Sequence, residues 1–208
     1  MVAITLPDGS VRDYDGAVSG AEIAASIGPG LAKAAVIVKV DGVERDLAHL
    51  IKGDAAVEIV TRDSDTGLHL LRHDCAHILA EAVQELFPGT QITFGPATED
   101  GFYYDFHRKK AFTPDDFETI EKRMGEIVDR DETITREVWT REDAVRFFEE
   151  QGETFKAEHV GTLPEDVEIS MYRQGDWIDL CTGPHLPSTG RLGKSFKLMK
   201  LAGTNWRG

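Results

Sequence analysis

Apolar residues recur at helical spacing between residues 66 and 87, and this pattern predicts a long helix. The apolar stripe consists of Leu71, Cys75, Ile78, Leu79, Ala82 and Leu86. His73 and His77 lie one turn apart and fall on roughly the opposite side of the helix from the stripe. We therefore expect a helix with a core face and a polar histidine face.

Short apolar segments alternate with turn residues in the first 61 positions, which predicts a small module of strands around one helix. Strands are expected at residues 2–6, 11–14, 35–40, 43–47 and 57–60. Ser19 followed by Glu22 has the spacing of a capping box, and it predicts a helix over residues 20–27 that ends at Gly28-Pro29-Gly30. This order of elements is that of a ubiquitin-like β-grasp fold.

The polar residues 61–66 predict a linker to a second module of mixed helices and strands, so the expected fold class is α+β. Strands are expected at residues 91–94, 101–106, 134–139, 167–172, 177–180 and 195–201. Thr113 and Thr140 predict two helix starts, the first with proline at its first helical position. A turn at residues 174–176 predicts a hairpin that brings Asp179, Cys181 and His185 together.

Composition narrows the class of protein. The net charge of −14 argues against a general nucleic-acid-binding surface, although it leaves room for a local basic group. Such a group is present near the end of the chain, in Lys194, Lys197, Lys200 and Arg207. No run of 18 apolar residues occurs, no signal peptide is apparent, and two cysteines make no disulfide framework. We therefore expect a cytoplasmic protein of one or two domains.

Two short motifs carry the candidate chemistry. His73 and His77 form HxxxH on the predicted helix, and Cys181 and His185 form CxxxH in a turn rich in glycine and proline. Together they offer imidazoles and a thiol, which suit either a hydrolytic site or a metal site. The spacing by itself does not separate zinc ligands from a metal-free acid–base site.

The chain resembles the N-terminal half of bacterial threonyl-tRNA synthetases over nearly all of its 208 residues. The matching stretches are residues 4–9, 72–77, 101–105, 152–156, 179–185 and 196–200, and residues 206–208 resemble the point where such enzymes continue toward the aminoacylation domain. Residues 4–10 and 27–34 also resemble the TGS domain, which is a β-grasp docking module.

This resemblance implies a TGS domain at residues 1–61 and an editing domain at residues 66–208. The editing domain would hydrolyse serine that is wrongly esterified to threonine tRNA. The aminoacylation domain, with its ATP and zinc, would lie outside this chain, so no aminoacylation is expected from it. The expected partner is the acceptor end of tRNA(Thr) carrying serine, and no membrane is involved. We expect the chain to be a monomer and the longer enzyme to be a homodimer.

The resemblance also implies roles for seven residues. The catalytic set is His73, His77, Lys156, Cys181 and His185, and the substrate-binding set is Asp179 and Tyr104. His73 would accept a proton from water, with His77 beside it, and Lys156 would stabilise the oxyanion or orient the water. Asp179 would pair with the serine ammonium, Tyr104 would contact the substrate, and Cys181 and His185 would line the pocket.

Members of the threonyl type are expected to edit without a metal. The alanyl type uses an equivalent quartet for zinc, so zinc at His73, His77, Cys181 and His185 is the alternative. Two other functions stay open at this point. One is a zinc-dependent, free-standing trans-editing hydrolase, and the other is a non-catalytic module that docks on RNA.

Overall fold

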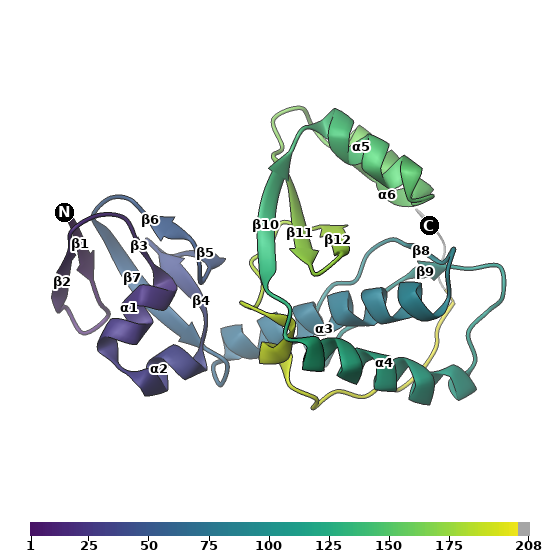
Figure 1. Cartoon of the computed structure of the whole chain (residues 1–208), viewed down its shortest axis with the longest axis horizontal. Helices are drawn as coiled ribbons and strands as arrows, with labels where there is room; N and C mark the ends of the chain where they lie inside the picture. The colour runs from purple at the N-terminus through teal and green to yellow at the C-terminus, as the bar shows by residue number, and fades with distance from the viewer. Residues whose placement is uncertain (204–208) are drawn as a thin grey trace. The chain divides into compact units, whose positions relative to one another are not determined.

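The computed structural model describes residues 1–203, and its contacts divide the chain into two compact units (Figure 1). The first unit comprises residues 1–71 with 183–187, and the second comprises residues 72–182 with 188 onward. Arg207 and the expected continuation at 206–208 lie outside the described residues. Among the residues that are described, no helix combines the length and the apolar content needed to cross a membrane.

The first unit is built on a five-stranded sheet in the order β2-β1-β7-β4-β5. Its strands are β1 (Val2–Thr5), β2 (Val11–Tyr14), β4 (Ala35–Val40), β5 (Val43–Asp46) and β7 (Ala55–Thr61). β1 and β7 are parallel, whereas the other neighbours are antiparallel. The β-grasp expectation is thus confirmed, and the sequence missed only the two-residue strands β3 (Val18–Ser19) and β6 (Leu50–Ile51).

Helix α1 (Gly20–Ile27) starts at the expected capping box. The hydroxyl oxygen of Ser19 accepts from the Glu22 backbone N–H at 3.2 Å, and the Glu22 carboxylate accepts from the Ser19 N–H at 2.8 Å. The helix ends before Gly28 as predicted, but a second helix, α2 (Pro29–Ala34), begins directly afterwards. Proline fits the first position of a helix because that position needs no N–H donor, so Pro29 starts α2 rather than ending the helical region.

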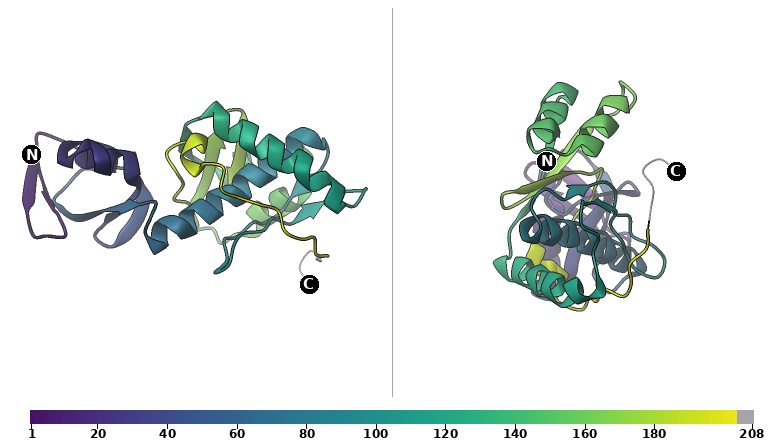
Figure 2. Two further views of the ribbon diagram at one scale, coloured as in Figure 1. Left: turned by 90° about the horizontal axis from the view of Figure 1, so that it is seen from below. Right: turned by 90° about the vertical axis from the view of Figure 1, so that its right-hand side faces the viewer.

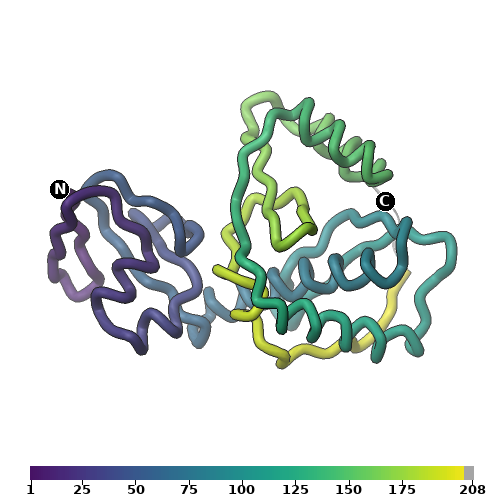
Figure 3. The backbone as a smooth tube through the Cα atoms, viewed as in Figure 1, coloured from purple at the N-terminus to yellow at the C-terminus, as the bar shows by residue number. Residues whose placement is uncertain are grey.

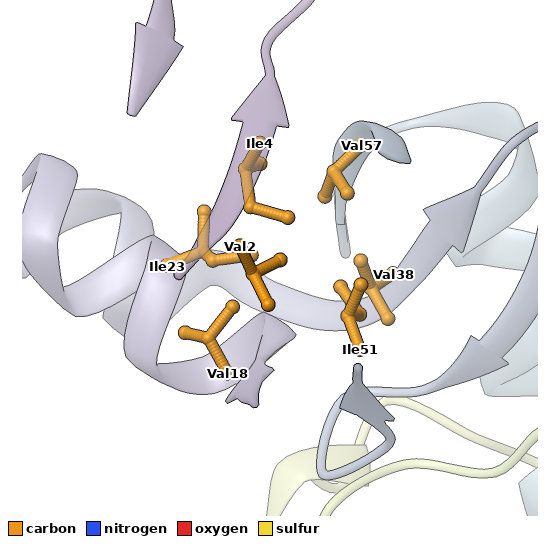
Figure 4. Packing of buried hydrophobic residues seen from close by; sticks show 7 residues of the cluster. All are labelled: Val2, Ile4, Val18, Ile23, Val38, Ile51 and Val57. Carbon is orange, nitrogen blue, oxygen red and sulfur yellow. The ribbon is translucent and has the colours of Figure 1, made fainter. Parts of the chain in front are cut away.

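One apolar core holds this unit together. Figure 4 shows the side chains of Val2, Ile4, Val18, Ile23, Val38, Ile51 and Val57 gathered at a common centre. Helices α1 and α2 lie on one face of the sheet, which the left view in Figure 2 shows from the side. Burial of each aliphatic side chain of this kind contributes about 1.5–3 kcal/mol to the stability of the folded state.

Helix α3 (Asp65–Leu86) is the central element of the second unit. Every residue of this helix from 74 to 83 is buried. The expected apolar stripe is present, with Cys75, Ile78 and Leu79 in the interior. The expectation of a separate polar face was wrong in one respect, because His77 is as buried as the stripe. A sheet covers that side of the helix, and sequence periodicity cannot reveal such a layer.

That sheet has the order β10-β11-β12, with β10 (Ile134–Trp139), β11 (Ile169–Gln174) and β12 (Trp177–Leu180) all antiparallel. Its apolar face, with Ile169, Met171 and Ile178, packs against α5 (Arg141–Glu150) and α6 (Thr154–Thr162). The alternation along β11 and β12 places the polar side chains on the opposite face. These side chains are Tyr172, Gln174, Trp177 and Asp179.

Local signals located several further elements correctly. The helix expected after Thr113 is a 3₁₀ turn η1 (Pro114–Asp116) that leads into α4 (Phe117–Arg130), and Thr140 caps α5 as expected. Helix α6 was missed. The strands expected at 91–94 and 101–106 shrink to β8 (Gln91–Ile92) and β9 (Phe106–His107).

The strand expected at 195–201 is not formed. After a 3₁₀ turn, η2 (Thr189–Leu192), the chain instead runs along α4 (Figure 3). The Leu198 N–H donates to the Glu121 carboxylate at 2.6 Å, and Lys194 pairs with Asp129 at 2.6 Å. Residues 195–201 do alternate, but the Leu198 N–H is taken by a side chain of α4 and not by a neighbouring strand.

Candidate functional site

His73 and His77 of α3 lie together at the polar face of the three-stranded sheet. Their ring centroids are 4.9 Å apart, as expected for residues one helical turn apart. His77 is 4% exposed, whereas His73 is half-buried. His69, which lies one turn earlier on the same side of the helix, is exposed. The site therefore begins where α3 enters the interior.

Asp179 is the most connected side chain of the site, and it is 1% exposed. Its Oδ1 lies 2.8 Å from the ammonium of Lys156, and its Oδ2 accepts from the Tyr104 hydroxyl at 2.7 Å. The same Oδ2 lies 3.7 Å from Nδ1 of His77. Asp179 thus links an ammonium, a phenol and an imidazole, and a serine ammonium would have to share this carboxylate.

Lys156 reaches Asp179 from α6, the helix that the sequence did not predict. The side chain is buried at 2% exposure, and its ammonium lies 5.6 Å and 5.8 Å from the ring centroids of Phe94 and Tyr104. A buried ammonium requires a paired anion, because an isolated charge in the interior costs several kcal/mol. The Lys156–Asp179 pair is therefore a structural and an electrostatic unit.

Tyr104 lies in the interior, whereas the neighbouring Tyr103 is exposed. Tyr104 is 8% exposed and Tyr103 is 48% exposed. The ring of Tyr104 passes so close to Gly95 that a Cβ atom there would lie 2.1 Å from it. Burial, together with the neighbouring Asp179 carboxylate, raises the pKa of Tyr104, so the hydroxyl stays protonated and donates.

Cys181 lies directly after β12 and is half-buried. Its Sγ is 3.2 Å from Nε2 of His73, which is within hydrogen-bonding distance for sulfur. The other cysteine, Cys75, is buried in the apolar interior, and this burial raises the pKa of its thiol to about 12. Cys181 is thus the thiol that the structure places at the histidines.

The four motif residues are grouped closely enough to hold a metal ion. One ligand atom from each of His73, His77, Cys181 and His185 lies within 4.8 Å of the others. Tetrahedral ligands at about 2.0–2.3 Å from a zinc ion are about 3.3–3.8 Å apart, so some of these atoms would have to move closer by about 1 Å. Three imidazoles and one thiolate are also a donor set that zinc accepts. In addition, the His185 backbone N–H donates to Asp46 at 2.9 Å.

Sequence reasoning missed the residues that surround His77. The indole of Trp177 meets the His77 ring edge to face with centroids 5.8 Å apart, and its Nε1 donates to Gln84 at 2.7 Å. Glu153 is buried and accepts from Gln84. A signal for Trp177 was available, because it precedes Asp179 by two positions on a strand and therefore shares its face.

A cavity of about 520 Å³ adjoins the residues that surround His77. Its walls include Gln84, Glu153 and Trp177, together with Phe147 of α5. Among the residues that the structure describes, none of the seven expected site residues lines it. The cavity is therefore a neighbour of the candidate site and not the site itself.

Glu81, one turn after His77, gives a prediction for stability. It is 2% exposed, accepts from Gln174, and lies 3.2 Å from Arg130. Burial raises its pKa from 4.5 to about 7. Between these two values the folded chain holds a proton that the unfolded chain has released, so stability falls as the pH rises through this window. For one such group the loss between pH 5 and 8 is on the order of 2 kcal/mol.

We expect Glu81→Gln to flatten this part of the pH dependence. The measurement is the free energy of unfolding in urea at several pH values between 5 and 8. Tryptophan fluorescence reports on the second unit, because all three tryptophans lie after residue 72. Glu85→Gln is the matched control. Its hydrogen bond from Arg130 lowers the pKa of Glu85, so it is ionised in both states above pH 5. An unchanged slope in Glu81→Gln would contradict the prediction.

Comparisons with known proteins show which families the chain resembles. Residues 2–61 match the TGS domain, and residues 169–206 match the threonyl and alanyl tRNA synthetase second additional domain. The threonine–tRNA ligases of Rhodospirillum rubrum and Maricaulis maris are each 61% identical over 208 residues, which is 100% of this chain and 32% of each relative. The ligase of Gluconobacter oxydans is 60% identical over the same share. The chain thus spans about a third of the length of these curated relatives.

Proposed function

The chain carries the TGS and second-additional-domain region of threonine–tRNA ligases, and from this premise we propose that it is an editing hydrolase. Its substrate would be tRNA(Thr) that carries serine in place of threonine, and its reaction would take place in the cytoplasm. The observation that supports this most is the buried group of His77, Lys156, Asp179 and Tyr104 next to the His73–Cys181 pair.

The difficulty of distinguishing serine from threonine explains why a ligase would need a hydrolytic site in addition to its synthetic site. The two amino acids differ by one methyl group, and a synthetic pocket gains only about 1–3 kcal/mol from such a group, or roughly 10–200-fold. A site that excludes threonine by its methyl group and hydrolyses serine adds a second, independent selection. A chain that edits therefore needs a pocket for hydrolysis and has no need of an ATP site of its own.

In the proposed reaction, the imidazole of His73 accepts a proton from water while the water oxygen attacks the ester carbonyl carbon. His73 is suited to this role because it is half-buried, so that water can reach it, and the thiol of Cys181, 3.2 Å from its Nε2, helps to orient the ring. The negative charge then develops on the carbonyl oxygen. When the tetrahedral intermediate collapses, the bond to the ribose oxygen breaks, and that oxygen takes the proton from His73. Free serine and uncharged tRNA are the products.

Lys156 supplies positive charge near the oxyanion in this scheme. An ammonium has three N–H donors, and Asp179 takes one of them at 2.8 Å. Because the group is buried, its charge acts across a low dielectric and is worth more than it would be in water. Asp179 remains the proposed partner of the serine ammonium, and Tyr104 holds the carboxylate in position through its hydroxyl.

The two alternatives without a ligase context are not favoured, because the match to threonine–tRNA ligases covers the whole chain. We propose that the ligation of threonine to tRNA(Thr) with ATP belongs to the part of such a ligase outside the matched third. Zinc at the four grouped residues remains the alternative for the cofactor, since their donor atoms fit it. A zinc ion held by three of the four residues would keep its fourth position for an acidic water, and Lys156 would then matter less.

The test is deacylation of seryl-tRNA(Thr) and threonyl-tRNA(Thr) by this chain in the presence of a chelator. Release of serine but not of threonine would support metal-free editing. Release that appears only after zinc is restored would support the four-ligand site. If neither ester is hydrolysed under either condition, the proposed editing activity of this chain is wrong.

A further inference from the structure

Glu153 occupies the start of a hydrogen-bonded path that leads to His77. Its Oε2 accepts from the backbone N–H of Ile92 at 2.8 Å, and its Oε1 accepts from the side-chain amide of Gln84. The carbonyl oxygen of Gln84 in turn accepts from the indole N–H of Trp177 at 2.7 Å. The Trp177 ring then meets the ring of His77 edge to face.

Each member of this path makes a hydrogen bond or a ring contact that helps to orient the next member. The Ile92 N–H belongs to the backbone of β8 and cannot rotate, so it fixes the carboxylate of Glu153. A carboxylate only accepts, so it turns the NH₂ group of Gln84 toward itself and the carbonyl oxygen of Gln84 away. That carbonyl oxygen then meets the indole N–H. The Thr90 carbonyl accepts from the same NH₂ group at 3.2 Å and supports this orientation of Gln84.

The first member of this path, Glu153, lies in the interior and not at the surface. Glu153 is 6% exposed, and its burial raises its pKa to about 7, while Lys156 and Asp179 are the charged groups near it. A buried carboxylate is costly unless its hydrogen bonds are complete. An apolar pair at these positions would fill the same space without that cost. A packing role alone therefore does not account for the choice of glutamate.

We propose that Glu153 and Gln84 are positioning residues that hold Trp177 against His77 and so fix the orientation of the His77 imidazole. The orientation matters because Nδ1 of His77 lies 3.7 Å from Asp179, and the His77 ring lies 4.9 Å from that of His73. A rotation of the ring would move both contacts. The effect on hydrolysis rests on the editing function proposed above, whereas the effect on the ring does not.

The substitution Glu153→Gln tests this path without changing side-chain volume. Glutamine has one acceptor oxygen and one NH₂ donor, and the fixed Ile92 N–H claims the oxygen. The new NH₂ group then faces the NH₂ of Gln84. If Gln84 turns over to relieve this contact, its NH₂ faces the indole N–H of Trp177 instead. In either case one hydrogen bond of the path is lost, and the last link to His77 is loosened.

The first measurement is the NMR signal of the His77 ring protons in the chain without tRNA. We expect these signals to shift and broaden in Glu153→Gln, because the ring current of Trp177 acts on them. The control Glu150→Gln makes the same change at an exposed position of α5 and should leave them unchanged. Unchanged His77 signals in Glu153→Gln would overturn the proposal, whatever the outcome for activity.

The second measurement is the kinetics of serine release. We expect Glu153→Gln to lower kcat between about tenfold and 100-fold with little change in KM, because it displaces a catalytic group without removing a substrate contact. In a Trp177→Phe background, where the indole N–H is absent, the same substitution should have little further effect. A full, independent loss in that background would overturn the proposed path. If the unsubstituted chain releases no serine, the editing function fails, and the NMR result alone decides on the path.

Discussion

Lys156→Met should lower the free energy of unfolding of the second unit by roughly 3–5 kcal/mol and abolish serine release. The substitution removes the only ammonium that is seen to pair with Asp179 in the described residues, and it keeps a side chain of similar length. Asp179 is 1% exposed, so its carboxylate would remain in the interior with the Tyr104 hydroxyl and the Leu180 N–H as donors. Urea denaturation followed by tryptophan fluorescence measures the loss.

A double substitution separates stability from activity. In Lys156→Met with Asp179→Asn, neither of these two positions carries a charge, and the asparagine oxygen still accepts from Tyr104. We expect most of the stability to return, because replacing both members of a buried pair costs far less than removing one. Serine release should stay low, since neither the ammonium nor the carboxylate is present. Recovery of activity along with stability would mean that Lys156 has only a structural role.

Lys110→Met is the matched control for Lys156→Met. Lys110 is exposed, so loss of its charge should change the stability by no more than about 0.5 kcal/mol. A loss in Lys156→Met that is no larger than in this control would contradict the buried pair itself.

His73→Ala should lower the rate of serine release by roughly 10²–10⁴-fold, which is the usual contribution of a general base. The structural reason is that Nε2 of His73 lies beside the thiol of Cys181 in a half-buried position where water can approach. The effect on stability should be small, because the side chain is only partly buried. Single-turnover deacylation of seryl-tRNA(Thr) measures the rate directly.

His69→Ala provides the comparison on the same helix. His69 is exposed one turn before His73, so this change removes an imidazole without reaching the interior. We expect normal deacylation from His69→Ala. Equal losses in the two variants would show that the effect arises from α3 as a whole and not from the proposed base.

Elements that depend on neighbouring residues in the sequence were predicted well. The capping box of Ser19 and Glu22 placed α1, the long apolar stripe placed α3, and the turn at Gly175 placed the hairpin of β11 and β12. Each of these signals lies within a few residues of the element that it specifies. The physical cause is local, since caps, helical stripes and turns depend on backbone geometry over one or two turns.

The predictions from the sequence were wrong where the local structure depends on contacts with distant parts of the chain. Helix α6 has no clear apolar stripe, and its helical form follows from packing against α5 and the sheet. The alternating residues 195–201 meet α4 rather than a partner strand, so they remain extended without pairing. The histidine face of α3 is buried because a sheet that forms some sixty to a hundred positions later in the chain lies over it.

The sequence by itself determined the α+β class, the β-grasp module and the residue types of the candidate site. Two motifs supplied His73, His77, Cys181 and His185, and the resemblance to threonyl-tRNA synthetases added Lys156, Asp179 and Tyr104, but neither said which of them touch. Only the tertiary structure joined Lys156 to Asp179 and Tyr104, and only it brought Glu153, Gln84 and Trp177 to His77. The reason is physical, because burial and charge pairing depend on what surrounds a side chain in space, and residues far apart in the chain supply those surroundings.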